Sequence, residues 1–312
     1  KAQFIGVASI GAFSFFGAFT VLKLLNYFYP LRVSSLQEEL GLNIAQFTAD
    51  MLNVDLPTDI VHKQIGLIQK ACQLYNVEIT STFTGAFTRV NHLAHPDPDI
   101  RKYWVSWFKR FVDLSVDLGS KSMGSHFGIF THLDNNNPQT RYIRRQQNID
   151  GWHDIANYAK NKGLDFISWE PMSISREQGE TISEARRLQR DVNINSPLPF
   201  KMCLDVDHGD LSSLDPRDTD PYEWMDEFAI ESPLIHLKQT SIDKPGHWPF
   251  VNEYNKVGRI QPDELVGKLV NKKVLNVDLL LEPGFKEREP SDSTVVEVLK
   301  ESVEFWRQVV KN

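Results

Sequence analysis

Short apolar runs alternate with longer stretches of helical pattern along most of the chain, and this alternation restricts the possible folds more than any other feature. The stretches between the runs carry apolar residues at helical spacing, as residues 100–118 do between an Asp97-Pro98 cap and Gly119. The runs start 33 to 44 residues apart, which is close to the length of one βα unit. They cover residues 44–50, 77–83, 121–127, 165–170, 201–205, 234–237 and 277–282.

An eighth run near residues 4–8 completes a series of eight strands and eight helices, with no linker rich in serine, glycine or proline between them. This series predicts an α/β fold that consists of a single (β/α)8 TIM barrel spanning residues 1–312. A doubly wound open sheet is the alternative. That fold would need a glycine-rich phosphate loop after an early strand, and the chain contains neither GxGxxG nor GxxxxGKS or GxxxxGKT.

The composition is that of an ordinary globular enzyme, and the charge balance bears on its partners. Hydrophobic residues make up 41% of the chain and charged residues 24%, and the formal net charge is −7. A net acidic chain does not suggest the basic surface that binds nucleic acid, so no nucleic-acid partner is expected. Cys72 and Cys203 are too few for a disulfide framework and have no zinc-site spacing, which is typical of a cytoplasmic protein with reduced thiols.

Residues 4–22 contain no charged side chain, and the stretch is long enough for a signal sequence or a membrane span. Three glycines interrupt it, no arginine-rich flank precedes it and no A-x-A site ends it. We therefore expect the first strand and its loop here, and no membrane association. A targeting segment or an anchor is the alternative.

Acids and imidazoles close the apolar runs in the second half of the chain. In a TIM barrel the chemistry gathers at the carboxyl ends of the strands. A hydrophobic or turn-forming residue would be the default at these positions. The ends carry, in order, His126, Glu170, Asp205 with His208, His236, and Glu282.

Four of these side chains would meet at one point if their strands are neighbours in a barrel. Glu170, Asp205, His236 and Glu282 supply three carboxylates and one imidazole. Such a set suits one divalent ion, Mn²⁺, Mg²⁺ or Co²⁺, while Zn²⁺ is possible but normally draws more nitrogen or sulfur ligands. Each residue alone could be a helix cap or a loop carboxylate. Four at the ends of consecutive strands predict a metal site.

The motifs around these residues resemble those of the xylose-isomerase-like barrel superfamily, and especially of its ketose 3-epimerase branch: Glu170-Pro171, Asp205 with His208, His236 followed by Pro245-Gly246, and Glu282. The resemblance covers residues 160–290 well and the first half of the chain only by topology. Within it, WEPMS, CLDVDHGD, HLKQT and HWPF are most similar to the isomerase/epimerase group of bacterial erythritol catabolism, which acts on a four-carbon ketose phosphate.

The resemblance also implies a role for each residue. Glu170, Asp205, His236 and Glu282 would hold the metal, and Glu170 and Glu282 would in addition form the catalytic acid/base pair. His208 would contact the substrate. The enzyme would accordingly be an isomerase that acts on carbohydrates.

Three positions depart from the ketose 3-epimerase pattern. Gln239 and Ile242 stand where that pattern has a glutamate and an arginine, and Arg176 stands where it has a second glutamate. An arginine favours an anionic substrate end, because a guanidinium grips phosphate while a glutamate would repel it. Lys238 would add positive charge. The partner is thus expected to be a small sugar or sugar phosphate, although Arg176 could equally be a solvated residue at the start of a helix.

The segment 240–260 is long for a βα loop and is rich in aromatic residues. Such a loop would act as a lid that excludes water from the reaction, with His247 and Trp248 facing the substrate. His126 is a further candidate for substrate contact. The alternative for the segment is a cluster that merely packs loop against helix.

Two glutamates beside a metal-held ketose suggest proton removal to a cis-enediolate and proton return to the opposite face. For a tetrulose phosphate this is epimerisation at C3. Aldose–ketose isomerisation, epimerisation of a non-phosphorylated sugar and dehydration of a cyclitol on the same barrel remain open. So do an apurinic-site endonuclease, which would need more histidines and a basic face, and a non-catalytic sugar-binding module. A homodimer or homotetramer is also possible.

Overall fold

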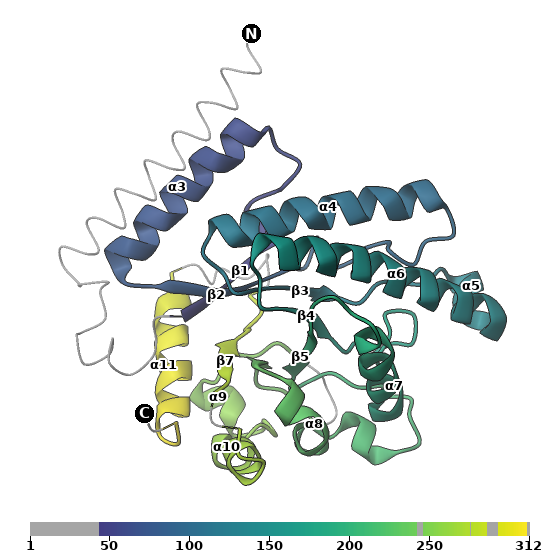
Figure 1. Cartoon of the computed structure of the whole chain (residues 1–312). Helices are drawn as coiled ribbons and strands as arrows, with labels where there is room; N and C mark the ends of the chain where they lie inside the picture. The colour runs from purple at the N-terminus through teal and green to yellow at the C-terminus, as the bar shows by residue number, and fades with distance from the viewer. Residues whose placement is uncertain (1–43, 242–245, 275, 286–292, 311–312) are drawn as a thin grey trace, which may run out of the picture.

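The computed structural model describes residues 44–241, 246–274, 276–285 and 293–310. Seven parallel strands form one sheet in sequence order and curve into a nearly closed barrel (Figure 1). The prediction of an α/β barrel is confirmed. The strand expected at residues 4–8 and the apolar stretch 4–22 lie outside the described residues. The strands are β1 Ile44–Thr48, β2 Glu78–Phe83, β3 Ser122–His126, β4 Phe166–Glu170, β5 Phe200–Asp205, β6 Leu234–Leu237 and β7 Asp278–Leu281.

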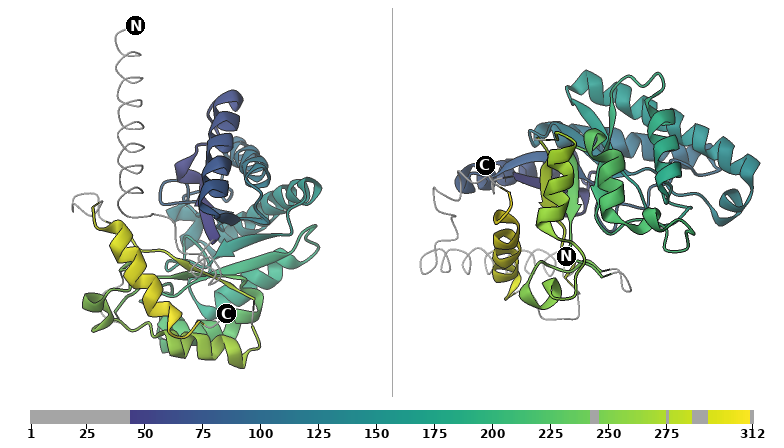
Figure 2. Two further views of the ribbon diagram at one scale, coloured as in Figure 1. Left: turned by 90° about the vertical axis from the view of Figure 1, so that its left-hand side faces the viewer. Right: turned by 90° about the horizontal axis from the view of Figure 1, so that it is seen from below.

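Helices follow the strands and lie around the outside of the barrel, as the two views of Figure 2 show. The longest of the described helices, α6, is preceded by Asn137, whose side chain caps it. It is followed by Gly163, whose φ of 96° is a left-handed conformation that favours glycine. The helices are α3 Thr58–Tyr75, α4 Pro98–Asp117, α5 His132–Asn136, α6 Pro138–Lys162, α7 Ile182–Asn193, α8 Pro221–Phe228, α9 Asn252–Asn255, α10 Pro262–Asn271 and α11 Val295–Arg307.

A layer of large aromatic side chains fills the space between helices and strands. Phe108 of α4 packs on Trp152 of α6 with ring centroids 4.7 Å apart, and both are fully buried. Phe127 and Trp169 continue this layer beside β3 and β4. Burying apolar area of this extent is the main source of stability for the helical shell. Among the described helices, none combines the length and the apolar character needed to cross a membrane.

The register of the strands places polar residues of neighbouring strands at one level. His126 of β3 lies opposite Glu170 of β4, and Asp205 of β5 lies opposite His236 of β6. The backbone N–H of Glu282 donates to the Leu237 carbonyl at 2.8 Å, which continues the β6–β7 ladder one residue past β7. The expected convergence at the carboxyl ends of the strands follows from this register.

The interior of the barrel is narrow. A Cβ atom on Gly124 of β3 would lie 2.2 Å from Ser168 Oγ and 2.3 Å from the Phe83 ring, so this position requires glycine. Polar side chains also join strands that are far apart in the sequence. Thr80 of β2 donates to Asp278 of β7 at 2.8 Å.

Candidate active site

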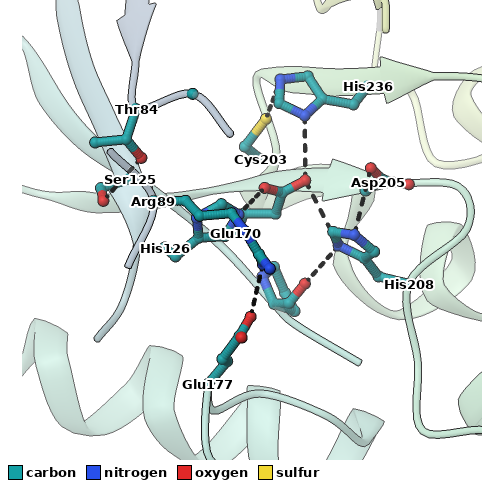
Figure 3. A network of polar contacts seen from close by, with 12 residues as sticks. Thr84, Arg89, Ser125, His126, Glu170, Glu177, Cys203, Asp205, His208 and His236 are labelled. Atoms are coloured by element: carbon teal, nitrogen blue, oxygen red, sulfur yellow. Dashed lines mark hydrogen bonds and ion pairs between the residues drawn. The ribbon is translucent and has the colours of Figure 1, made fainter. Parts of the chain in front are cut away.

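Four ionisable side chains meet at the carboxyl ends of β4 to β7. Glu170 ends β4, Asp205 ends β5, His236 lies in β6 and Glu282 follows β7 directly. Each offers one ligand atom, and these atoms all lie within 4.8 Å of one another. Figure 3 shows Glu170, Asp205 and His236 pointing into this cluster. Glu170, Asp205 and His236 are buried, while the Glu282 side chain is 43% exposed and marks the open end.

Glu170 is surrounded by three imidazoles. Its Oε2 lies 2.8 Å from His126 Nε2, and its Oε1 lies 3.1 Å from His236 Nδ1 and 3.5 Å from His208 Nδ1. Burial alone would raise the pKa of this carboxyl, but the imidazoles outweigh it and hold the pKa well below its usual range. Glu170 is therefore an ionised carboxylate in a buried position.

His236 is oriented by a residue of β1, at the other end of the strand order. Its Nε2 lies 2.7 Å from Gln46 Oε1 of β1, and the Gln46 amide is in turn held by Ser81, to which its Nε2 donates at 3.2 Å. With Nε2–H donating to Gln46, Nδ1 faces Glu170 and Glu282, at 3.1 and 3.7 Å. Fixing one ring nitrogen in this way makes the other available as a metal ligand.

The charge of His236 depends on the same neighbours. Burial lowers the pKa of its imidazole, but Cys203, Glu170 and Glu282 together raise it well above the ordinary value. The Cys203 sulfur lies 3.3 Å from His236 Nε2, and burial raises the pKa of this thiol to about 11. The carboxylates thus stabilise positive charge at His236 Nδ1.

Asp205 presents one carboxylate oxygen to the cluster. Its Oδ1 accepts the backbone N–H of Asp207 at 2.7 Å. Its Oδ2 is buried, and the ammonium of Lys238 lies 2.5 Å away. Burial would lower the pKa of Lys238, but the charges of Asp205, Glu282 and Glu170 raise it, so the side chain is a cation.

Glu282 differs from Glu170 in its surroundings. Its Oε2 is 3.4 Å from Lys238 Nζ and 3.9 Å from His247 Nδ1. Partial burial, with the charges of Asp205 and Glu170, raises the pKa of Glu282 above its usual range, against the opposing effect of His236 and Lys238. The two glutamates therefore hold protons with different strength.

The residues fit a divalent cation. Three carboxylates and one imidazole nitrogen lie within coordination reach of one point. Asp205 Oδ2 is a buried carboxylate oxygen, a ligand type that hard divalent cations prefer. A divalent ion would take the place of the proton at His236 Nδ1, since metal ligands must be deprotonated.

The remaining predicted residues fall into two groups. His126 and His208 belong to the cluster: His208 Nε2 is 3.6 Å from Asp205 Oδ2, and its Nδ1 is 2.9 Å from the Pro171 carbonyl. Lys238 also belongs to it, and His247 lies against its ammonium, with ring nitrogens at 3.2 and 3.3 Å.

Trp248 and Arg176 make their contacts with loop residues outside the four central side chains. Trp248 pairs with Gln239 in an isolated antiparallel bridge, and its ring stacks on Tyr254 at 5.0 Å between centroids. The Arg176 Nε–H donates to the Phe130 carbonyl at 3.1 Å, and the Arg176 backbone carbonyl accepts the Phe130 N–H at 2.8 Å. These two hydrogen bonds join the loop after β4 to the loop after β3. Among the described residues, no contact joins Arg176 to the four central side chains.

Sequence reasoning missed residues that support the cluster from the first strands. Gln46 orients His236, and the Phe83 ring lies edge-on to His236 at 5.4 Å and to His126 at 6.0 Å. A single amide within the apolar run of residues 44–50 was the available signal for Gln46. Near the same face, Arg89 pairs with Glu177 at 2.9 Å (Figure 3).

Comparison with known proteins agrees with this geometry. The family model of the xylose isomerase-like TIM barrel matches residues 36–309. The chain is 41% identical over 275 residues to a D-erythrulose 1-phosphate 3-epimerase of Brucella abortus (strain 2308), an alignment that covers 88% of this chain and 89% of the relative. These similarities support the predicted enzyme class, an isomerase of the epimerase type.

Solved structures share the fold at lower identity. A candidate xylose isomerase of Rhodospirillum rubrum ATCC 11170 superposes with a TM-score of 0.78 and 23% identity, covering 88% of this chain and 92% of that chain. A D-psicose 3-epimerase of Clostridium cellulolyticum H10 gives a TM-score of 0.63 and 16% identity, covering 88% and 91%. The chain therefore belongs to the xylose isomerase-like TIM barrel family.

Proposed function

We propose that the chain is a metal-dependent 3-epimerase of a short-chain ketose phosphate, with erythrulose 1-phosphate as the substrate to test first. The observation that carries the proposal is the convergence of Glu170, Asp205, His236 and Glu282 within 4.8 Å at the mouth of the barrel. The substrate of the Brucella relative supports the choice of a tetrulose phosphate.

Glu170, Asp205, His236 and Glu282 would hold one divalent ion, Mn²⁺, Mg²⁺ or Co²⁺. Such an ion supplies Lewis-acid stabilisation of the negative charge that develops on the ketose oxygens. Cytoplasmic location, a homodimer or homotetramer, and the absence of nucleic-acid and membrane partners remain predictions from the sequence.

Glu170 and Glu282 would exchange the proton at C3. They come from β4 and β7, with β5 and β6 between them, so they approach the site from different sides. Because their surroundings shift their pKa values in opposite directions, one carboxyl is suited to removing a proton and the other to returning it. Proton return to the opposite face inverts C3.

The substrate contacts follow from the side chains around this pair. His126 and His208 flank Glu170 and would hydrogen-bond the sugar hydroxyls. Lys238 would supply charge for the phosphate and His247 a hydrogen bond, with Arg176 reaching it from the loop after β4. The segment 240–260, with Trp248, would cover the substrate as a lid. Its Phe250 packs on Trp306 of α11 at 5.2 Å, which would anchor the described part of the lid.

Proton exchange in D₂O tests the proposal. With erythrulose 1-phosphate and Mn²⁺, we expect deuterium at C3 and interconversion of the two enantiomers. Both signals should disappear in Glu170→Gln and in Glu282→Gln. Glu227→Gln removes a carboxylate that pairs with Arg186 on the outside of the barrel and should retain activity.

Three other results would contradict parts of the proposal. With free erythrulose, deuterium at C1 and formation of an aldose would indicate aldose–ketose isomerisation. Exchange with free erythrulose but not with its phosphate would exclude the phosphate contacts. Full activity after chelation and gel filtration would exclude the metal.

A further inference from the structure

A buried ammonium lies inside the acidic cluster. Lys238 is two residues past His236 in the strand direction, so both side chains leave β6 on the same side. Lys238 Nζ lies 2.5 Å from Asp205 Oδ2 and 3.4 Å from Glu282 Oε2, and its side chain is fully buried. A lysine is almost never buried to this degree unless it is paired.

The contact with Asp205 is the shorter of the two that the ammonium makes with these carboxylates. Asp205 Oδ1 accepts the Asp207 N–H at 2.7 Å, while Oδ2 faces the ammonium and lies 3.6 Å from His208 Nε2. The ammonium is therefore the nearest positive charge to the oxygen that faces the cluster. The same carboxylate oxygen is one of the atoms available to a divalent cation.

The charges of the cluster also balance with Lys238 included. Glu170, Asp205 and Glu282 carry three negative charges, which a divalent cation and one ammonium together neutralise. A second positive charge so close to the cation weakens its binding, because like charges repel strongly in a site of low dielectric constant.

We propose that Lys238 sets the affinity of the centre for its divalent cation, by repelling the cation and by competing with it for Asp205 Oδ2. The proposal rests on the metal centre of the proposed function. Lys238 acts here through the metal ligands, as a residue that tunes the centre. Weaker binding would allow the metal to exchange. When the cation binds Asp205, the ammonium would lose this partner and could bind an anionic substrate.

A direct titration with Mn²⁺ tests this role without measuring turnover. Lys238→Met removes the charge and keeps much of the volume, and Lys238→Gln keeps a polar end group in case the first variant folds poorly. We expect the Kd for Mn²⁺, from calorimetry or from the electron paramagnetic resonance signal of free Mn²⁺, to fall by about tenfold or more in both variants. The rise in Tm on adding Mn²⁺ should be correspondingly larger than in the wild type.

Lys268→Met is the matched control. Lys268 pairs with Asp226 between α10 and α8, on the outside of the barrel, and its loss should leave the Kd for Mn²⁺ unchanged. Unchanged or weaker Mn²⁺ binding in folded Lys238→Met or Lys238→Gln would overturn the proposal while leaving the metal centre intact. A wild-type protein that binds no Mn²⁺, Mg²⁺ or Co²⁺ would instead refute the metal centre of the proposed function.

Discussion

Asp50 and Glu170 are both carboxylates at the carboxyl ends of barrel strands, yet their surroundings differ completely. Asp50, just after β1, accepts hydrogen bonds from the backbone N–H groups of Phe87 and Thr88, at 2.9 and 3.0 Å, and from the Thr88 hydroxyl at 2.6 Å. Glu170, at the end of β4, meets three imidazoles.

The difference shows why position at a strand end does not by itself identify a functional acid. Asp50 is satisfied by neutral donors of one loop, so its charge is used to hold that loop. Glu170 is surrounded by groups that can gain or lose protons, and such clusters are typical of functional sites. The four proposed ligands thus lie at the ends of β4 to β7, and β1 and β3 contribute Gln46 and His126 around them.

The largest effect should come from the charge of Glu170. Glu170→Gln keeps the shape of the side chain but removes a ligand and a proton acceptor, so we expect kcat to fall by about 10³-fold or more. Turnover of erythrulose 1-phosphate measures the loss, and circular dichroism verifies the fold. A kcat within about tenfold of the wild type would place the catalytic carboxylate elsewhere.

Gln46 tests a contact in which β1 supports the site directly. Gln46→Leu removes the acceptor for His236 Nε2 and so releases the orientation of the imidazole. Loss of such a supporting partner typically costs about 10–100-fold in metal affinity. Calorimetric titration with Mn²⁺ measures the change, and an unaltered Kd would show that His236 is oriented without Gln46.

Asp50→Ala should produce the opposite pattern to Glu170→Gln. It leaves three donors of the loop without their acceptor, and we expect the free energy of unfolding to fall by about 1–3 kcal/mol, with kcat at saturating Mn²⁺ nearly unchanged. Urea unfolding monitored by fluorescence gives the first quantity. Loss of activity in a stable, folded Asp50→Ala protein would erase the distinction between the two halves.

A substitution of Asp278 should give the smallest effect on stability. Asp278 lies at the start of β7, far from the carboxyl ends of the strands. Burial, with the charge of Glu78, raises the pKa of Asp278 in the folded state, although its bond from Thr80 opposes this. The folded state then binds more protons than the unfolded state between the ordinary and the raised pKa, so stability falls as pH rises through that window.

Asp278→Asn removes this titration. The free energy of unfolding of the variant should not show this decline with pH. The expected difference between variant and wild type in the size of the decline is below about 1 kcal/mol. Urea unfolding at a series of pH values from acid to neutral measures it. A decline of the same size in the variant would assign the effect to other carboxylates.

The fold and the central residues could be predicted because both depend on local sequence. Apolar runs at regular spacing specify parallel strands, and an acid that ends such a run has few structural reasons to be there. That rule also selects Asp50, so the four residues proposed as ligands follow from it only together with their position on consecutive strands. Their order along the chain matches the order of the strands.

The contacts between distant segments could not be predicted. Gln46 reaches His236 across 190 positions, and Arg176 is held by a backbone carbonyl that no pattern reveals. The stacking of the Trp248 ring on Tyr254 was also not predicted, and the contact of Trp248 with substrate stays a prediction. Such contacts depend on loop conformation and on barrel curvature, which a single sequence does not encode locally.

The hydrogen bond from His236 to Gln46 also makes the geometry of the site depend on the assembly of the barrel, because it joins β6 to β1. The proposed ligands come from four consecutive strands, which could pair as a partial sheet before β1 has joined them. The contact that orients the imidazole forms only when β1, with Gln46, has taken its place in the barrel. A half-assembled molecule would therefore carry all four proposed ligands without the contact that orients His236.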